Sequence, residues 1–352
     1  MTTSTPKPDL SSPAAIIELG TAFCTAKCLL TALELGLFTE LAERPASRDE
    51  IQQALGLHPR AVRDYLNILV NLDLLARDGD KFCNSESADR WLVRTRPNYV
   101  GGFLERANHM LYPAWGRFHE LLQDGKPTAA ADYQEMIKDP DKLRRFLGMM
   151  DALNGMVAEE LAKVFPWSEY TSVLDVGGAR GNLVGNLIRL QPHLRGNVFD
   201  LPVMAEAFAE HMAQLGLTDK VTFHPGSFFD NPIPAVADVI TIGHVLHDWS
   251  FEENQIIVDR AFAALPAGGA LVVYDRMVDE HGTDLTNLVV SINMMMTTPN
   301  GAEYTPKECV SWLERAGCVE LSQRPLGPTD TIVVGRKPTE AKLAPANPRN
   351  PT

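Results

Sequence analysis

The feature that most constrains the fold is a series of short apolar segments between residues 172 and 337, separated by helix-like segments. Six of them predict β-strands because they are short and apolar, are bounded by glycine and alternate with helical stretches: SVLDVG, GNVFD, KVTFHPG, ADVITIGHV, ALVVYDRM and TIVVGRK. The stretches between them, such as LPVMAEAFAEHMAQLG, have a helical pattern. This alternation predicts an α/β fold with a doubly wound, mostly parallel sheet, whose ligand lies at the carboxyl ends of the strands.

The first third of the chain predicts helices, because apolar residues recur near the helical period: Ile16, Leu19, Phe23, Leu30, Leu33, Leu37 and Leu41. Residues 47–85 then give two short helices, a turn and a hairpin, which is a winged-helix pattern. Such a unit often reads DNA, but its second helix offers mainly Arg60 and Arg63. The flanking apolar helices predict burial against a second copy, so we expect a homodimer; a DNA-binding regulator is the alternative.

Charge and composition bear on partners and location. The formal net charge of -13 opposes binding to nucleic acid, and no basic patch offsets it. No run reaches the roughly eighteen uninterrupted apolar residues of a membrane helix, so we expect no membrane partner. The 5 cysteines are an odd number without a disulfide pattern, which predicts a cytoplasmic protein. Cys24 and Cys28, although spaced like metal ligands, are interpreted as small buried residues.

A glycine-rich turn follows the first predicted strand, in the run DVGGARGNL. Glycines at Gly177 and Gly178 allow a ligand close to the backbone, and the next helix offers unpaired N–H groups. A dinucleotide fingerprint would need glycine where Ala179 and Asn182 stand, so NAD binding is disfavoured. Asp200, at the end of the second strand, is either a ribose ligand or a helix cap.

The most specific segment is GHVLHDWS, residues 243–250, at the end of the fourth predicted strand. Together with DVGG and FDLP upstream, it resembles the class I O-methyltransferases of the plant caffeate type and their bacterial natural-product relatives. The resemblance covers nearly the whole chain, since that family also carries an N-terminal winged-helix dimerisation domain. It implies S-adenosylmethionine as cofactor, a Rossmann-like methyltransferase domain and an aromatic small-molecule substrate.

The resemblance also assigns the acid–base residues. His247 corresponds to the family's base, Asp248 to a substrate neighbour, and Asp275 and Glu303 to the two acidic residues beside that base. A phenol loses its proton near pH ~10, so at neutral pH it needs a base during attack. Asp275 stands where the family usually has a glutamate, which makes its contact with His247 less certain than that of Glu303. His244 is interpreted as structural.

The remaining cofactor assignments follow the family's motifs and are Gly177, Gly178, Asp200, Leu201, Ser227, Phe228, Gly243 and Asn154. Ser227 replaces an adenine-binding aspartate, which puts that contact in doubt, while Phe228 is the predicted ring platform. Gly243 replaces a lysine and is expected to leave room for a larger substrate. Met149 and Met150 are either core residues or part of a pocket for a flat substrate, together with Asp248.

We therefore expect transfer of a methyl group to a hydroxyl of an aromatic small molecule in secondary metabolism, with no metal. Methylation at carbon or nitrogen, and a family member with a different reaction, remain alternatives. The predicted segments are a disordered N-terminus (1–12), a helical winged-helix dimerisation domain (13–100), a helical linker contributing to the substrate pocket (101–165), an S-adenosylmethionine-binding methyltransferase domain (166–337) and a disordered tail (338–352).

Overall fold

A computed structural model describes residues 9–96, 98–129 and 139–339. The chain forms two compact units, which divide between Phe118 and His119. We describe each unit by itself.

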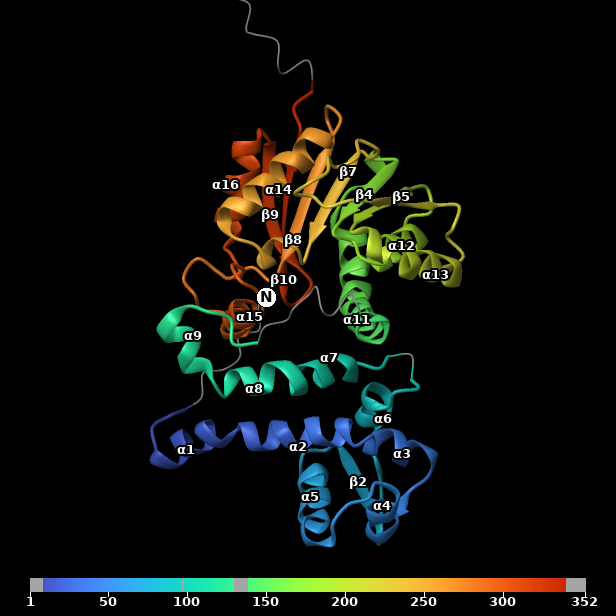
Figure 1. Cartoon of the computed structure of the whole chain (residues 1–352), viewed down its shortest axis with the longest axis vertical. Coiled ribbons are helices and arrows are strands. Elements are labelled where there is room, and N and C mark those ends of the chain that lie inside the picture. The colour runs from blue at the N-terminus through green and yellow to red at the C-terminus, as the bar shows by residue number, and fades with distance from the viewer. Residues whose placement is uncertain (1–8, 97, 130–138, 340–352) are drawn as a thin grey trace, which may run out of the picture. The chain divides into compact units, whose positions relative to one another are not determined.

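The N-terminal unit consists of short helices around a small antiparallel sheet, as the winged-helix pattern predicts (Figure 1). The sheet has the order β1-β3-β2, and the hairpin turns at Gly79, whose φ of 61° lies in the left-handed region. Ser47 and Glu50 form a capping box that begins α4. The elements are α1 (Pro13–Thr21), α2 (Phe23–Glu34), α3 (Leu37–Glu43), β1 (Ala46–Ser47), α4 (Arg48–Ala54), α5 (Pro59–Asn71), β2 (Leu75–Asp78), β3 (Lys81–Asn84), α6 (Glu86–Leu92), α7 (Gly101–Arg106), η1 (Ala107–Leu111), α8 (Tyr112–Trp115) and α9 (Phe118–Asp124), which extends past the division.

Helices α1 and α2 carry large apolar side chains that are exposed in the single chain. Ile16, Ile17, Leu19 and Phe23 are each more than half exposed. Residues Pro13–Glu34 are also long and apolar enough, by length and composition alone, to cross a membrane, which is weak evidence for a span. Cys24 is exposed and Cys28 is half-buried, so the prediction that both cysteines of the pair are buried is wrong.

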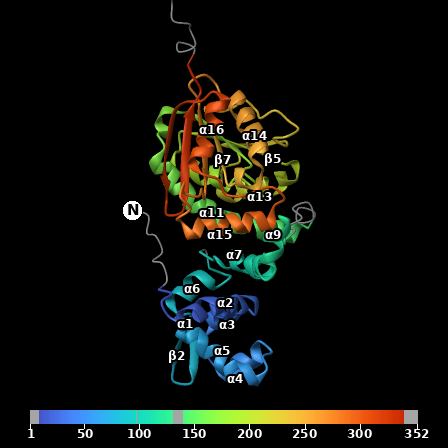
Figure 2. The same ribbon diagram turned by 90° about the vertical axis from the view of Figure 1, so that its left-hand side faces the viewer.

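The larger unit is built on a seven-stranded sheet of order β6-β5-β4-β7-β8-β10-β9, in which β10 is antiparallel to both of its neighbours. All six predicted strands are present, but β9 was missed: it is an antiparallel edge strand with mostly exposed, polar residues and so lacks the apolar signal. Figure 2 shows this edge in red. The strands are β4 (Ser172–Val176), β5 (Arg195–Asp200), β6 (Val221–Pro225), β7 (Val239–Gly243), β8 (Ala270–Asp275), β9 (Val319–Leu326) and β10 (Asp330–Arg336).

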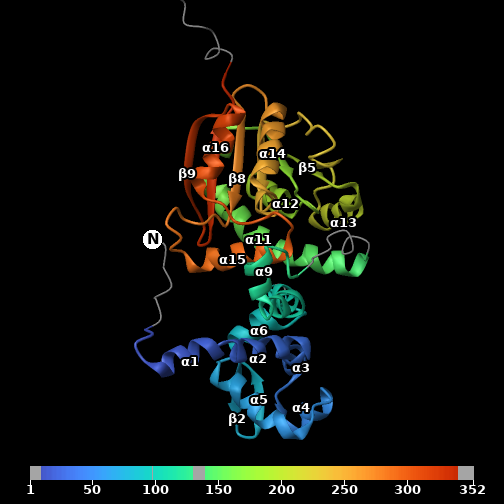
Figure 3. The ribbon, with the colours of Figure 1, turned by 60° about the vertical axis from the view of Figure 1, so that its left-hand side comes forward.

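Helices cover both faces of this sheet, so alternate side chains of each strand enter different cores. One core joins the sheet to α11, α12 and α13, and the other joins it to α14 and α16, which Figure 3 shows in front of the strands. The helical elements are α11 (Pro140–Val164), η2 (Trp167–Glu169), α12 (Asn182–Leu190), η3 (Pro202–Met204), α13 (Ala205–Leu215), η4 (Leu246–Asp248), α14 (Phe251–Ala264), α15 (Leu285–Thr297) and α16 (Pro306–Ala316).

The strand order reverses between β4 and β7, because the chain builds outward to β6 before it returns to β7. The carboxyl ends of β4, β5, β7 and β8 therefore meet at one edge of the sheet. A reversal of this kind opens a crevice outside the strand ends, where doubly wound sheets bind ligands. Gly177 follows β4, Asp200 and Asp275 are the last residues of β5 and β8, and His247 lies shortly after β7.

Candidate active site

The glycine-rich turn after β4 requires its glycines. Gly177 has a φ of 75°, and a Cβ there would lie 2.6 Å from Cγ2 of Val245. A Cβ at Gly178 would lie 2.6 Å from Oδ2 of Asp175. The turn thus keeps its backbone bare toward the strand ends, and Gly181, also left-handed, begins α12.

Asp200 turns back toward this glycine-rich loop. Its Oδ2 accepts a hydrogen bond of 2.7 Å from the N–H of Ala179, and its Oδ1 accepts one of 2.6 Å from the N–H of Leu201. Burial raises the pKa of Asp200, and these two N–H donors oppose that shift. The carboxylate joins the ends of β4 and β5, and each oxygen retains a lone pair for a further donor.

Ser227 and Phe228 follow β6. The N–H of Gly226 donates to the carbonyl of Asp200 at 2.9 Å, which brings this turn beside the second strand end. The ring of Phe228 packs against Phe229 and, at 5.6 Å between centroids, against Trp249. Ser227 Oγ accepts from the N–H of Phe229, so the serine side chain is engaged within its own turn.

The expectation of free space beside Gly243 is wrong. A Cβ on Gly243 would collide with the ring of Tyr274, which comes from the neighbouring strand β8 and is buried. The missing side chain is therefore compensated by an aromatic ring from the next strand. No local sequence pattern predicts that Tyr274 fills the space beside Gly243. The two residues are 31 positions apart and become neighbours only through the parallel pairing of β7 with β8.

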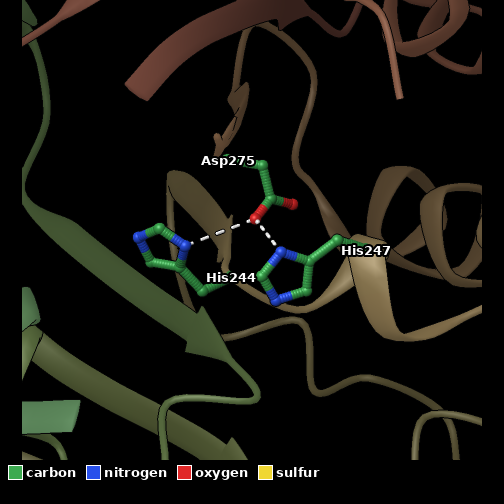
Figure 4. Close-up of side chains that lie close together, drawn as sticks. All are labelled: His244, His247 and Asp275. Carbon is green, nitrogen blue, oxygen red and sulfur yellow. Dashed lines mark ion pairs between the residues drawn. The ribbon is translucent and has the colours of Figure 1, made fainter. Parts of the chain in front are cut away.

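His247, Asp275 and Glu303 lie together, as the resemblance implied. Nδ1 of His247 lies 2.8 Å from Oε1 of Glu303 and 3.1 Å from Oδ1 of Asp275. Figure 4 shows the Asp275 carboxylate directed toward the imidazole. The shorter aspartate side chain thus reaches His247 after all. Both carboxylates face Nδ1, which leaves Nε2 directed elsewhere, 3.9 Å from Asp248 Oδ1.

The two carboxylates dominate the electrostatics of the imidazole. Burial alone would lower the pKa of His247, but the charges of Asp275 and Glu303 outweigh it and raise that pKa well above its ordinary value. Burial likewise works to raise the pKa of Asp275, but the charges of His247 and His244 bring it below the usual range. For Glu303, burial prevails and raises the pKa. An imidazolium at His247 is therefore strongly stabilised.

Neighbouring segments fix both carboxylates. The hydroxyl of Tyr304 donates to Oδ2 of Asp275 at 2.7 Å. The N–H of Glu303 donates to Ser291 Oγ on α15 at 3.2 Å. A Cβ at Gly301 would collide with the carbonyl of His247, so this glycine lets the Glu303 turn approach η4 closely. The NGAEYTP run carried that glycine signal in the sequence.

Sequence reasoning did not indicate the contacts that His244 makes with Asp275 and Asp330. Nδ1 of His244 lies 3.4 Å from Oδ1 of Asp275, and Nε2 lies 3.4 Å from Oδ1 of Asp330 on β10. His244, His247 and Asp275 also bring potential metal-ligand atoms within 4.8 Å of one another. A single histidine at a strand end does not predict contacts with Asp275 and Asp330, because both residues lie far from His244 in the sequence.

Three assigned residues lie on α11. The side chains of Met149, Met150 and Asn154 are outside the described residues. Nearby, Arg180 of the glycine-rich turn forms an ion pair with Asp151, and the side-chain amide of Asn182 donates to the carbonyl of Asp151 at 3.1 Å. The described part of α11 is thus tied to the turn after β4.

The fold and this site define a class I S-adenosylmethionine-dependent methyltransferase. Residues 120–319 match the O-methyltransferase domain family, and residues 17–94 match the O-methyltransferase dimerisation domain. The chain belongs to this O-methyltransferase family.

Two curated relatives and one solved structure illustrate the likeness. The chain is 43% identical to the tetracenomycin polyketide synthesis 8-O-methyl transferase TcmO of Streptomyces glaucescens, over 95% of this chain and 99% of the relative. It is 36% identical to the N,N-dimethyltransferase OxyT of Streptomyces rimosus, over 90% and 93%. Human N-acetylserotonin methyltransferase in complex with S-adenosylmethionine has the same fold, with a TM-score of 0.84 at 23% identity over 95% of this chain and 100% of that one.

The residues present fit the cofactor of this family. The turn at Gly177 and Gly178 has no room for side chains, and Asp200 offers buried acceptor oxygens beside it. Carboxylate oxygens at a strand end, beside a turn without side chains, can accept hydrogen bonds from the hydroxyls of an adenosine ribose.

Proposed function

We propose that this enzyme methylates a phenolic hydroxyl of an aromatic polyketide, with His247 as the general base. The observation that supports this most directly is the contact of His247 Nδ1 with two buried carboxylates at the carboxyl end of β7. Because Nδ1 faces the carboxylates, Nε2 is the nitrogen that would accept the proton of the substrate hydroxyl.

Cofactor binding is assigned to the two turns described above. The backbone of Gly177 and Gly178 and the carboxylate of Asp200 would hold the adenosine ribose, with Leu201 beside it. Ser227 and Phe228 would meet the adenine, and Gly243 and Asn154 complete the proposed set. When bound, S-adenosylmethionine supplies an electrophilic methyl group on a sulfonium.

The chain's own contribution to the chemistry is orientation and proton transfer. The Nδ1 proton of His247 is held by Glu303, which fixes the tautomer with Nε2 as acceptor. As the substrate oxygen attacks, its proton passes to Nε2, and Asp275 and Glu303 stabilise the imidazolium that forms. Asp248, Met149 and Met150 are the proposed substrate neighbours.

The substrate class rests on the relatives. TcmO is named as an 8-O-methyl transferase of polyketide synthesis and is 43% identical along nearly the whole chain. A phenol on a fused aromatic scaffold suits a buried histidine base, since its proton is acidic enough to be removed during attack. OxyT, named as an N,N-dimethyltransferase, supports methylation of an amine as the second candidate.

We also propose a cytoplasmic homodimer with no nucleic acid or membrane partner. The match of residues 17–94 to a dimerisation domain supports this, as does the exposed apolar surface of α1 and α2. A second copy would cover these side chains, which also accounts for the membrane-like hydropathy of Pro13–Glu34.

Two measurements test the proposal. Calorimetric titration with S-adenosylmethionine and S-adenosylhomocysteine should give micromolar binding, and the absence of binding to both would refute it. Phenolic polyketide scaffolds, their O-methylated analogues and amino analogues would then be compared for methyl transfer. Transfer to the phenols alone supports the O-methylation; transfer to the amines alone would establish the second candidate instead.

A further inference from the structure

The backbone of His244 is held in an unfavourable conformation immediately after β7. Its φ of 52° lies in the left-handed region, which costs energy for any residue with a Cβ. The N–H of His244 donates to the carbonyl of Tyr274 at 3.2 Å, and the ring of Tyr274 packs edge-on against the imidazole at 5.5 Å between centroids. Strained residues persist where surrounding contacts over-determine them, and they concentrate at functional sites.

The imidazole of His244 lies between two buried carboxylates. Only 8% of its side chain is exposed, and its two nitrogens lie 3.4 Å from Oδ1 of Asp275 and 3.4 Å from Oδ1 of Asp330. Neither oxygen has a hydrogen-bond partner of good geometry among the described residues. The imidazole of His244 lies between these two oxygens and links Asp275 to Asp330.

Three carboxyl groups, those of Asp275, Glu303 and Asp330, are buried around His244 and His247. A buried carboxyl group is costly unless it has a polar partner. The imidazole of His244 is the group that faces both Asp275 and Asp330.

The same contacts determine where the Asp275 carboxylate points. Tyr304 holds Oδ2, and His244 lies at Oδ1, the oxygen that also faces His247 Nδ1 (Figure 4). The titratable groups around His244 are His247 and Asp248 of η4, Tyr274 and Asp275 of β8, Asp175 of β4, Glu303 and Tyr304 of the turn before α16, and Asp330 of β10.

We propose that His244 is a positioning residue for methyl transfer: held by Asp330, it keeps the Asp275 carboxylate aimed at Nδ1 of His247. It touches neither substrate nor cofactor and acts through Asp275. This inference rests on the proposed role of His247 as base.

The test compares steady-state kinetics of the full-length enzyme, after dialysis against a chelator, with those of His244→Asn. Asparagine tolerates the left-handed backbone but removes the imidazole that links Asp275 to Asp330. We expect kcat to fall about tenfold, with KM for the substrate and the calorimetric affinity for S-adenosylhomocysteine within about twofold of the parent. His193→Asn is the matched control, because His193 contacts the carbonyl of Trp167 outside the cluster and should leave kcat unchanged.

A double-mutant cycle tests whether His244 acts through Asp275. In an Asp275→Asn background, His244→Asn should cause no further loss, because the residue through which it acts is already neutral. Independent, multiplying losses would overturn the inference, as would an unchanged kcat in His244→Asn. If His244→Asn does not fold, Asp330→Asn decides: a lower kcat supports the inference and an unchanged kcat overturns it.

Two further outcomes distinguish this inference from the proposed role of His247 as base and from a metal site. If His247→Ala keeps the parent's kcat, the proposed base is wrong and the inference falls with it, whereas loss in His247→Ala with no effect of His244→Asn overturns the inference alone. If the chelator abolishes activity of the parent enzyme and zinc restores it, His244, His247 and Asp275 are metal ligands and the inference is also overturned.

Discussion

The proposed cofactor side and the proposed acid–base side of the active site lie at the same edge of one sheet but are built differently. The centre of the proposed cofactor side is the glycine-rich turn after β4, together with the Asp200 carboxylate at the end of β5, which accepts a hydrogen bond from the N–H of Ala179 in that turn. The acid–base side gathers charged side chains from η4, β8 and the turn before α16. A site formed mainly by the backbone of one turn is specified by the local sequence. A buried cluster of charged side chains forms only if the fold brings together residues that are distant in sequence.

The sharpest test of this division is His247→Ala. Because only the chemical step needs the base, we expect kcat to fall about a thousandfold while the affinity for S-adenosylhomocysteine stays within about twofold. Single-turnover kinetics and calorimetry measure the two quantities. Equal losses of kcat and of cofactor affinity would contradict the division into two sides, since His247 would then contribute to cofactor binding as well.

The reciprocal change is Asp200→Ala. It removes the acceptor assigned to the ribose and should weaken calorimetric cofactor affinity about thirtyfold, with a much smaller loss of kcat at saturating cofactor. Asp230→Ala, at an exposed aspartate of the turn after β6, is a control that should bind the cofactor normally. Parent-like affinity in Asp200→Ala would refute the ribose assignment.

The pH dependence tests the charges around His247. Asp275 and Glu303 raise the pKa of His247, so its neutral imidazole forms only at a pH above the ordinary histidine pKa of about 6.5. The value of kcat/KM should therefore rise with pH through an acidic limb that lies above that pH. Glu303→Gln removes one of these charges, so the limb should move to lower pH and kcat should fall about tenfold. An unmoved limb would mean that Glu303 does not control the base.

Asp175, beneath the glycine-rich turn, should affect stability more than chemistry. Burial raises its pKa to about 7, against which the hydrogen bond from Thr241 works. Since the unfolded chain ionises at a lower pH, the parent should lose stability as pH rises from about 4 to about 7. Asp175→Asn should therefore exceed the parent's free energy of unfolding by about 2 kcal/mol at pH 8 and by much less at pH 5. Urea unfolding at both pH values measures this, and a difference independent of pH would contradict it.

Much of the fold was predictable because its signals are local. Short apolar segments that alternate with helical stretches identified six strands, and α16 begins at a capping box, formed by Thr305 and Glu308, that is likewise a local signal. Strand β9 was missed because an exposed edge strand lacks the apolar pattern of a buried one. The exposure of Cys24 was also missed, since its apolar neighbours on α1 and α2 are themselves exposed in the single chain.

The sequence by itself determined the class of enzyme, the glycine-rich turn after β4 and the position of the histidine in the HDW motif, because each depends on a short run of residues. Only the tertiary structure decided that Tyr274 fills the space beside Gly243, that the short Asp275 reaches His247, and that His244 lies between Asp275 and Asp330. These contacts join strands that are distant in sequence. Their distances depend on strand register and side-chain direction, which no local pattern encodes.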